Sequence, residues 1–536
     1  MNSKIFLGLI LGLALFLRLF QLGINPPSLY WDEASLGYNA YSILTSGKDE
    51  HGEVFPLARF IAFGDFKPPL YIYTASLSIL FFGLTEFAVR LPSSLAGFFM
   101  VLFTYLLCRE LFFKKRISLV ASFLIAVSPW SLQFSRAAFE ANLGALFNLM
   151  GIYFFVLFKR RKIAIFLSVI FFIFSFYTFN SNRITAPLLL AFLFIINFKT
   201  VLKNYLWVFV SILIGIILIL PSSHYLRDRE SRVRFQEVSI FNDLTPVEIS
   251  NQRSQREGNS PIAKVLHNRR VLFAVSFLKH FTANFDGRFL FVKGDANARL
   301  SILEMGELYP IELPLLILGV WYLALHKKKT GLIIALWMII AVIPAATAKE
   351  VPHALRIVSI LPSYQIIGAV GCMYLYHLIK YRQIKIGFFI SIFISLGYVF
   401  CVYYYLHNYY FHYPQESNFA WQYGYKQMVQ KVSQIENQYN RIFVTTALGR
   451  PYIYFAFYNR ISNQDFLKNK VADRDWYGFW TVSKLGKYYF DFTPLQNSRQ
   501  NDLIVTTPES IPGEFNVFDT IYDLEGKPVL VLADRR

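Results

Sequence analysis

Two adjacent carboxylates stand out near the start of the chain. Asp32 and Glu33 follow the first long apolar run and lie beside two aromatic residues, Tyr30 and Trp31. A carboxylate held there can act as a general base, which contributes roughly 10²–10⁴-fold to a rate. The alternative is a helix start, with Asp32 as N-cap and Glu33 in the first turn. Both are also candidate ligands for a divalent cation, whose presence the sequence leaves open.

A lysine ends the same polar segment. Lys67 directly precedes Pro68 and Pro69, and proline favours the first turn of a helix, so we expect Lys67 just before the next apolar helix. Its ammonium group could neutralise a phosphate there. The alternative is an anchor whose charged end reaches the water at the membrane surface.

Two further candidates for substrate binding come from one segment. Arg136 and Glu140 are four residues apart, which on a helix would put both side chains on one face. They could bind the phosphate or sugar of a substrate, or they could pair with each other.

The last candidates lie in the second half of the chain. Asp295 follows Lys293, and His353 and Arg356 are three residues apart before another apolar run. An arginine can hold a phosphate through two parallel hydrogen bonds, so Arg356 is a candidate phosphate ligand. A local pair with Glu350 is the alternative for Arg356.

The elements that position these residues are long apolar runs. The chain has 536 residues, of which 55% are hydrophobic and only 16% charged, whereas soluble domains are about 45–50% apolar and about 25% charged. Runs of about 20 apolar residues can cross a bilayer as helices. The sequence therefore predicts an α-helical polytopic membrane protein with 11–13 spans. The candidate spans are 4–22, 69–83, 87–107, 117–133, 141–158, 162–179, 184–197, 205–221, 310–325, 331–347, 357–378 and 385–406.

The positive charge sets the expected orientation. The formal net charge is +19, and much of the excess lies in short segments between spans, such as Lys114–Arg116 and Lys327–Lys329. This is the pattern of cytoplasmic loops, so no nucleic-acid partner is expected. The polar segments that carry the candidate site residues then fall outside, on the face of a cell membrane away from the cytoplasm. The stretch 69–113 leaves the parity of the spans open.

Two domains are expected. Residues 1–408 form the transmembrane domain, and its external segments 23–68 and 222–309 build the active site. Residues 409–536 form a small external α/β domain, with strands near 441–446, 502–507 and 528–533 and a helix near 419–435. Within 222–309, an amphipathic helix is expected over 261–285. The three cysteines, Cys108, Cys372 and Cys401, lie in apolar stretches, which argues against a disulfide framework.

Six short motifs occur in an order and spacing that resemble a known family, the bacterial relatives of protein O-mannosyltransferases and aminoarabinose transferases. The resemblance covers about 1–360. The motifs are Trp31-Asp32-Glu33, Lys67-Pro68-Pro69-Leu70-Tyr71, Val89-Arg90-Leu91-Pro92-Ser93, Ser135-Arg136 with Glu140, Phe291-Val292-Lys293-Gly294-Asp295 and Pro352-His353-Ala354-Leu355-Arg356.

This resemblance implies a GT-C fold and a glycosyltransferase that takes a hexosyl or pentosyl group from a polyprenyl-phosphate donor in the membrane. In such enzymes the acidic residue of the first external loop is catalytic, which corresponds to Asp32, and the lysine before the double proline contacts the carrier phosphate, which corresponds to Lys67. Aminoarabinose transferases have an aspartate where this chain has Glu140, so the sugar stays open.

We expect an inverting transfer in which Asp32 deprotonates an acceptor hydroxyl and Lys67 and Arg356 stabilise the leaving phosphate. The acceptor is a glycan, a lipid or a protein. The alternatives are a transporter or flippase of lipid-linked sugars and an oligosaccharyltransferase. Transporters tend to have internal repeats and charges near the midplane, whereas here the charges lie at span ends.

Overall fold

The computed structural model describes residues 3–63, 65–227, 237–381, 386–474, 480–491 and 501–535. The chain forms two compact units, each assembled from several segments. Unit 1 consists of Met1–Arg18, Leu95–Phe134 and Glu140–Tyr405. Unit 2 consists of Leu19–Ser94, Ser135–Phe139 and Leu406–Arg536. Segments on both sides of the expected boundary at 408 therefore share unit 2, and that boundary stays a prediction.

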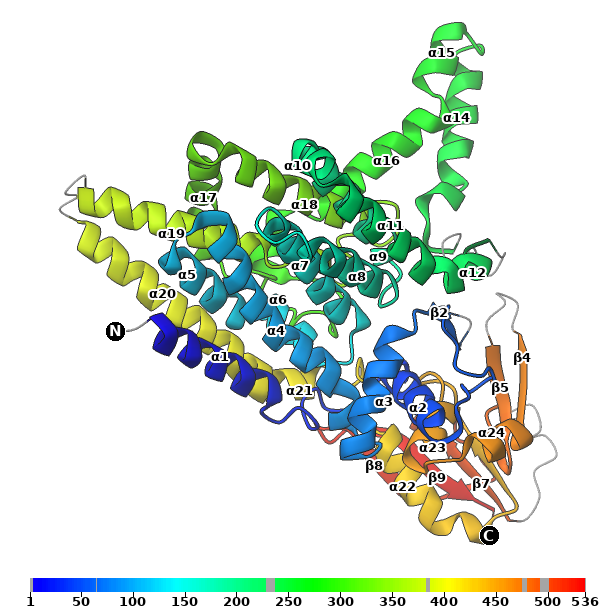
Figure 1. Cartoon of the computed structure of the whole chain (residues 1–536). Helices are drawn as coiled ribbons and strands as arrows, with labels where there is room; N and C mark the ends of the chain where they lie inside the picture. Colours follow the sequence, from blue (N-terminus) through cyan, green and yellow to red (C-terminus); the bar gives the residue numbers. More distant parts are fainter. Residues whose placement is uncertain are drawn as a thin grey trace. The chain divides into compact units, whose positions relative to one another are not determined.

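Unit 1 is made of helices, because its sequence is a succession of apolar runs separated by short polar turns (Figure 1). Four of its described helices, α1, α4, α6 and α20, extend past its limits into residues of unit 2. The helices are α1 (Ser3–Leu19), α4 (Glu86–Phe112), α5 (Lys115–Ala126), α6 (Pro129–Ser135), α7 (Glu140–Phe158), α8 (Ala164–Phe176), α9 (Asn182–Ile196), α10 (Phe198–Lys203), α11 (Tyr205–Ile219), α12 (Ser223–Arg227), α14 (Thr245–Arg256), α15 (Pro261–Leu266), α16 (Arg269–Ala283), α17 (Glu312–His326), α18 (Lys328–Ala346), α19 (Ser363–Tyr381) and α20 (Gly387–His407).

Several of these helices could cross a membrane. Among the described residues, 6 helices are long and apolar enough, or up to 7 if the bent pair α5 and α6 counts as one span. Only 11% of the most apolar 18-residue stretch of Gly387–Glu416, which contains α20, is buried inside the protein. Most of the apolar side chains of this stretch therefore need a lipid environment. The polytopic helical class is thus confirmed. The count of 11–13 stays a prediction, because four further apolar helices have fewer than 18 residues.

The bend between α5 and α6 is held by polar side chains of the same unit. The two helices meet at 56°, which leaves the last carbonyl groups of α5 without helical partners. The buried Arg18 donates hydrogen bonds to the Ala126 carbonyl at 3.1 Å and to Ser131 Oγ at 2.8 Å. Tyr309 Oη donates to the Val127 carbonyl at 2.7 Å. Since lipid offers no hydrogen bonds, these partners let the chain bend inside the bundle.

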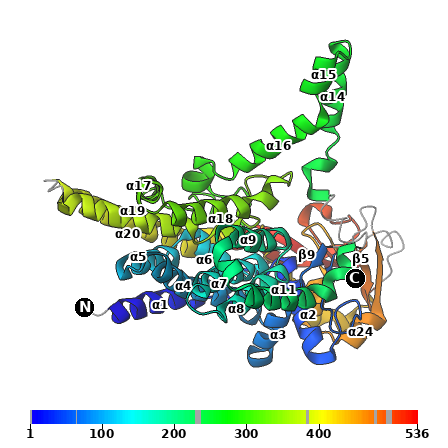
Figure 2. The same cartoon turned by 45° about the horizontal axis from the view of Figure 1, so that its top comes forward.

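The long segment after α11 folds largely into helices. In both views α14 and α15 extend away from the other helices of unit 1 (Figures 1 and 2). The prediction of a single amphipathic helix over 261–285 is wrong in one respect, because this segment forms two helices, α15 and α16. The break has a local cause, since Asn268 Oδ1 accepts a hydrogen bond from the Arg270 N–H at 2.9 Å and so starts a new helix.

Unit 2 joins early helices to a mixed sheet. The early part contains α2 (Trp31–Ser46), an antiparallel hairpin of β1 (Phe60–Ala62) and β2 (Asp65–Lys67), and α3 (Leu70–Phe82). The larger sheet has the strand order β4-β5-β6-β3-β7-β9-β8. Its strands and helices are β3 (Arg441–Val444), β4 (Lys470–Arg474), β5 (Trp480–Leu485), β6 (Tyr488–Tyr489), β7 (Asp502–Thr506), β8 (Asn516–Tyr522), β9 (Pro528–Asp534), α21 (Tyr413–Glu416), α22 (Tyr425–Ile435), α23 (Tyr452–Tyr458) and α24 (Asn463–Asn469).

The central strands of this sheet confirm the α/β prediction for the C-terminal region. β3 is parallel to β6 and β7, and β9 is antiparallel to β7. The three expected strands are β3, β7 and β9, and the expected helix is α22, which begins six residues later than predicted, at Tyr425 rather than at 419. All five residues of β7 are buried, which is typical of a strand covered on both faces.

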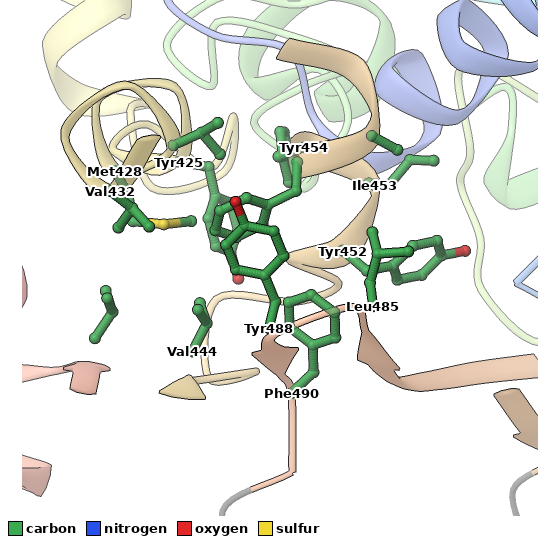
Figure 3. Close-up of a cluster of buried hydrophobic side chains, with 14 of the residues drawn as sticks. Tyr425, Met428, Val432, Val444, Tyr452, Ile453, Tyr454, Leu485, Tyr488 and Phe490 are labelled. Atoms are coloured by element: carbon green, nitrogen blue, oxygen red, sulfur yellow. The ribbon is translucent and has the colours of Figure 1, made fainter. Parts of the chain in front are cut away.

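The core of unit 2 includes α2. Figure 3 shows the buried cluster between α22, α23 and the sheet, in which Tyr425, Tyr454 and Tyr488 are labelled. The ring centroids of Phe455 and Tyr488 lie 4.2 Å apart. Ala34 and Tyr38 of α2 belong to the same cluster. A Cβ atom on Gly37 would lie only 2.5 Å from the Phe457 ring, so the close packing of α2 on α23 requires glycine there. The C-terminal segment of unit 2 therefore supports the helix that carries the two adjacent carboxylates.

Candidate active site

Helix α2 begins two residues earlier than the helix-start interpretation predicted. Its N-cap is Tyr30 in extended conformation, and Asp32 and Glu33 are the second and third helical residues. The N-cap assignment of Asp32 is therefore wrong, whereas the position of Glu33 in the first turn is confirmed. Two carboxylates in the first turn are favoured by the positive end of the helix dipole.

Asp32 pairs with the predicted phosphate ligand. Lys67 Nζ lies 3.1 Å from Asp32 Oδ1 and 3.6 Å from Asp65 Oδ2. The hairpin of β1 and β2 sets this geometry, because it pairs Lys67 with Phe60 and Asp65 with Ala62 and so fixes both side chains beside α2. The Asp32 side chain is 24% exposed, so a substrate can reach it. The ammonium group of Lys67 therefore lies near two carboxylates, those of Asp32 and Asp65.

Glu33 has the opposite surroundings, since its side chain is fully buried. Arg90 Nε and Nη2 donate to its two carboxylate oxygens, each at 3.0 Å. The N–H groups of Ala138 and Tyr30 donate as well, at 2.7 and 3.4 Å. Arg90 also donates to three backbone carbonyls, those of Leu22, Pro26 and Ser28. This buried pair connects three chain segments around the start of α2, namely 22–33, Arg90 and Ala138.

A glutamine ties the start of α2 to the C-terminal region. Gln422 Oε1 accepts the Trp31 N–H at 2.8 Å, and Gln422 Nε2 donates to the Leu448 carbonyl at 2.6 Å. Tyr454 Oη donates to the same Oε1 at 2.7 Å. Next to this contact, Gly449 has φ +128°, and a Cβ there would lie 2.3 Å from the Trp31 ring. The position of Asp32 thus depends on residues about 390–420 positions later in the chain.

Arg136 is buried among aromatic rings and carbonyl groups. Its Nη2 donates to the carbonyls of Phe20 and Asn25 at 2.7 and 3.0 Å, and its Nε donates to Tyr409 Oη at 3.1 Å. Its guanidinium lies 5.2 Å from the ring centroids of both Tyr409 and Tyr410. Its hydrogen-bonding groups are thus engaged by the protein, which leaves its assignment to phosphate binding a prediction.

The helical spacing of Arg136 and Glu140 is wrong. Helix α6 ends at Ser135 and α7 begins at Glu140, and the residues between them form turns. The two side chains therefore do not share a helix face. Glu140 is buried and is the first residue of α7, where a carboxylate is favoured by the helix dipole.

A second polar cluster lies in unit 1, around Asp295. This carboxylate accepts the N–H groups of Asn297 at 2.9 Å and Ala354 at 2.7 Å. Its own N–H donates to Glu307 Oε1 at 3.1 Å. Burial raises the pKa of Asp295, and burial together with the Asp295 charge raises the pKa of Glu307 well above its usual range. The loop that carries Asp295 is thereby joined to the segment before α19.

His353 and Arg356 have different roles in that cluster. His353 Nδ1 lies 3.9 Å from Asp295 Oδ2. Burial and then the charge of Arg356 lower the pKa of His353 to about 3, so its ring is neutral at neutral pH. Arg356 contacts Glu350, donating to its carbonyl at 3.1 Å with Nη2 3.6 Å from its Oε2. The local pair that the sequence offered as an alternative for Arg356 is therefore present.

The residues at the start of α2 do not fit a metal site. Glu33 accepts four hydrogen bonds, and Asp32 faces a lysine instead of a second acidic ligand. Within the described ranges, no group of three or more His, Cys, Asp or Glu side chains could hold a metal ion. The chemistry of Asp32 is therefore derived without a metal.

Comparison with known proteins identifies the fold. Residues 66–225 match the family model described as dolichyl-phosphate-mannose-protein mannosyltransferase. ArnT from Cupriavidus metallidurans, solved with undecaprenyl phosphate bound, is similar over 99% of this chain and 98% of that one, with a TM-score of 0.57 and 12% identity. The chain has the fold of the GT-C glycosyltransferases. The match and the fold confirm the resemblance predicted from the sequence.

A second GT-C structure is longer than this chain. The archaeal oligosaccharyltransferase AglB from Archaeoglobus fulgidus, in complex with an inhibitory peptide and a dolichol-phosphate, has a TM-score of 0.51 and 14% identity. The similarity covers 85% of this chain and 63% of that one, so the chain spans less than two thirds of that enzyme. No curated protein matches the chain in sequence.

Sequence reasoning missed several residues that position the site on this GT-C fold. Arg90 had a signal, because an arginine at the start of an apolar helix usually has a buried partner. Glu307 and Gln422 had none, since neither their spacing nor their neighbours distinguish them from surface residues. Their roles depend on contacts between distant segments.

Proposed function

We propose that this protein is a membrane glycosyltransferase that moves a sugar from a polyprenyl-phosphate donor to an acceptor hydroxyl. Asp32 is its general base, and Lys67 is its ligand for the donor phosphate. The transfer takes place at the membrane face away from the cytoplasm. The observation that carries this proposal is the 3.1 Å pair of Asp32 and Lys67 at the start of α2, where the carboxylate is accessible.

The chemistry follows from the two charges. Asp32 accepts the proton of an acceptor hydroxyl while that oxygen attacks the anomeric carbon of the donor sugar. The bond between the anomeric carbon and the phosphate oxygen breaks, and the bonding electrons leave with the phosphate. Lys67 stabilises that charge. A single attack from the face opposite the leaving group inverts the anomeric centre.

The pairing also suggests how donor binding prepares the base. Without donor, Lys67 neutralises Asp32 and has Asp65 as a second carboxylate neighbour. The phosphodiester of the donor carries one negative charge and attracts the same ammonium group. Its arrival draws Lys67 away from Asp32 and leaves that carboxylate able to accept a proton. The buried pair of Glu33 and Arg90 stays unchanged and holds α2 in position.

The similar structures support the donor class. ArnT was solved with undecaprenyl phosphate and AglB with a dolichol-phosphate, which are both lipid phosphates. The apolar helices of unit 1 provide the membrane setting that such a donor requires. The sugar and the choice among glycan, lipid and protein acceptors are properties to be measured.

The test is product analysis with the purified full-length chain. Incubation with a polyprenyl-phosphate-linked sugar and acceptor candidates should release free polyprenyl phosphate and yield a glycoside of inverted anomeric configuration. A transporter or flippase would leave the donor intact while moving it across a vesicle membrane. Retained configuration would contradict the single-displacement mechanism, and an intact donor with every acceptor class would contradict the enzymatic function.

A further inference from the structure

A basic cavity lies in unit 1. It has a volume of about 340 Å³ and lies among α5, α17 and α19. Its lining combines cationic, aromatic and apolar side chains. The residues are Lys114, Lys115, Arg116, Ile117, Tyr322, Val370, Met373, Tyr374 and His377.

The charged side chains that line this cavity are all basic. Lys114, Lys115 and Arg116 are exposed at the start of α5, and His377 faces the same space from α19. No acidic side chain is found among the described residues of the lining. Three cations held around a cavity repel one another, so an anion that enters it lowers the electrostatic energy of the site. In the free protein, the positive charge of this lining is therefore not balanced by an acidic residue of the lining.

The aromatic side chains give the cavity a defined wall. The rings of Tyr322 and Tyr374 lie 5.3 Å apart, and Tyr322 stacks on His326 at 4.8 Å. The guanidinium of Arg116 lies 5.8 Å from the Tyr376 ring, which orients it toward α19. Helices α17 and α19 pack closely against each other. The site is therefore formed by packed helices.

The position of the cavity separates it from the polar cluster around Asp295. Tyr322 lies in the last turns of α17, and Tyr374 and His377 lie in the last turns of α19. Asp295 and His353 lie in the loops that precede the first turns of these same two helices. The cavity is thus at the other end of the helices. The basic residues Lys114–Arg116 mark that end as the predicted cytoplasmic side.

The neighbouring surface is suited to acyl chains. Trp321 and Leu325 flank Tyr322 on α17 and are 59% and 53% exposed. Ile117, Val370 and Met373 make part of the cavity wall itself apolar. A ligand that satisfies both features has a phosphate head and hydrocarbon tails. Basic pockets between transmembrane helices at the cytoplasmic side are known to bind such headgroups.

We propose that this cavity binds the phosphate headgroup of an anionic glycerophospholipid, with Lys115 and Arg116 as its main charged ligands. The lipid fills the space between α5 and the ends of α17 and α19 and stabilises their packing. This site is independent of the proposed donor site at Asp32 and Lys67, and it requires no particular catalytic activity.

The test uses the full-length protein in a mild detergent. Native mass spectrometry with added phosphatidylglycerol or phosphatidylcholine should show preferential binding of phosphatidylglycerol. The double variant Lys115→Ala/Arg116→Ala should bind phosphatidylglycerol on the order of 10-fold or more weakly. The matched control Lys327→Ala/Lys328→Ala removes the same charge from exposed lysines outside the cavity and should bind as the wild type does.

The wild type supplies a second test that does not depend on the folding of a variant. Raising the salt concentration should weaken phosphatidylglycerol binding, because the contacts are partly solvent-exposed charges. Equal binding of both lipids, or equal loss in the double variant and its control, would overturn the proposal. Displacement of the lipid by inorganic phosphate at low millimolar concentration would overturn it too, in favour of a soluble-anion site.

One further comparison distinguishes this site from the donor site. Undecaprenyl phosphate should bind the Lys115→Ala/Arg116→Ala variant as it binds the wild type, because its proposed ligand is Lys67. Loss of both lipids in this variant would identify the cavity as a carrier site and contradict the glycerophospholipid proposal. Loss of undecaprenyl phosphate only in a Lys67 variant would leave both proposals intact.

Discussion

Asp32 and Glu33 are neighbours in the chain, but their side chains have opposite environments. Asp32 is accessible and faces a lysine, whereas Glu33 is fully buried and held by Arg90 and two backbone N–H groups. The difference follows from the helix geometry, because successive residues of a helix point about 100° apart. We therefore assign the chemical role to Asp32 and a positioning role to Glu33.

Stability measurements should separate these two roles. Glu33→Gln removes the charge that balances a fully buried arginine, and breaking such a pair costs about 3–5 kcal/mol. The melting temperature of the detergent-purified Glu33→Gln variant should therefore fall by several degrees or the variant should fail to fold. Asp32→Asn should melt within a degree or two of the wild type. Equal melting temperatures for the two variants would contradict the division of roles.

Lys67 offers a direct test of donor recognition. Lys67→Ala removes a charge-assisted contact worth about 1.5–3 kcal/mol, so the affinity for polyprenyl phosphate should fall on the order of 10- to 100-fold. Lys67→Arg keeps the charge and should recover part of that affinity. Isothermal titration or native mass spectrometry would measure both. Asp65→Asn is the matched control on the same hairpin and should leave the affinity within a few fold, whereas wild-type affinity in Lys67→Ala would move the phosphate site elsewhere.

At the scale of elements, the C-terminal segment of unit 2 holds the start of α2. Gly449→Ala introduces a Cβ against the Trp31 ring at a backbone conformation that favours glycine. We expect the turnover number to fall on the order of 10-fold while donor affinity changes little, because Lys67 comes from the hairpin. Gly486→Ala, at another glycine of positive φ with open space around it, is the control for general strain. If Gly449 had only a general structural role, the turnover numbers of Gly449→Ala and Gly486→Ala would fall equally.

The parity problem in 69–113 has an explanation in α3. This helix has 13 residues and so rises about 20 Å, less than the hydrocarbon core of about 30 Å. It belongs to unit 2 and packs on α2, while its exposed face carries Leu77, Leu80 and Phe81. We infer that α3 lies in the membrane interface without crossing it.

Cysteine labelling tests this placement of α3. A cysteine at Gly83, introduced into a variant without the three native cysteines, should react with a membrane-impermeant maleimide from the same side as a cysteine at Lys48. A Cβ at Gly83 would meet no atom within 4 Å, so a cysteine there clashes with no neighbour, although the φ of +69° at this position favours glycine. Labelling of the two positions from opposite sides would show that α3 crosses the membrane.

At the scale of the whole molecule, the sequence allowed the fold class, the family resemblance and three strands of the larger sheet, β3, β7 and β9, to be predicted. Long apolar runs and alternating strand patterns are local signals, and they led to α4, α7, β3 and β9 nearly at their observed bounds. Asp32 and Lys67 could be nominated because of the short motifs around them. Their 3.1 Å contact could not be predicted from the sequence, since it requires the hairpin of β1 and β2 to fold against α2.

The remaining differences come from tertiary contacts. The predicted external position of Arg136 made it a candidate substrate ligand, but Tyr409 and two distant carbonyl groups accept its hydrogen bonds. The helix expected around Arg136 and Glu140 is interrupted, because Ala138 donates its N–H to Glu33 and lies in a turn. Arg90 was part of a recognised motif, yet its partner lies 57 positions earlier. The sequence can indicate that Arg90 has a buried partner, but it does not identify Glu33 as that partner.

The most direct test of the whole account is the single-turnover rate of Asp32→Asn with saturating polyprenyl-phosphate sugar. We predict a loss of at least about 10²-fold in the rate of transfer, since a general base contributes at least that much. Donor affinity should stay within a few fold of the wild type, because Lys67 still binds the phosphate. A variant that keeps more than about a tenth of the wild-type rate would contradict the assignment of Asp32 as the base, and with it the mechanism proposed for this fold.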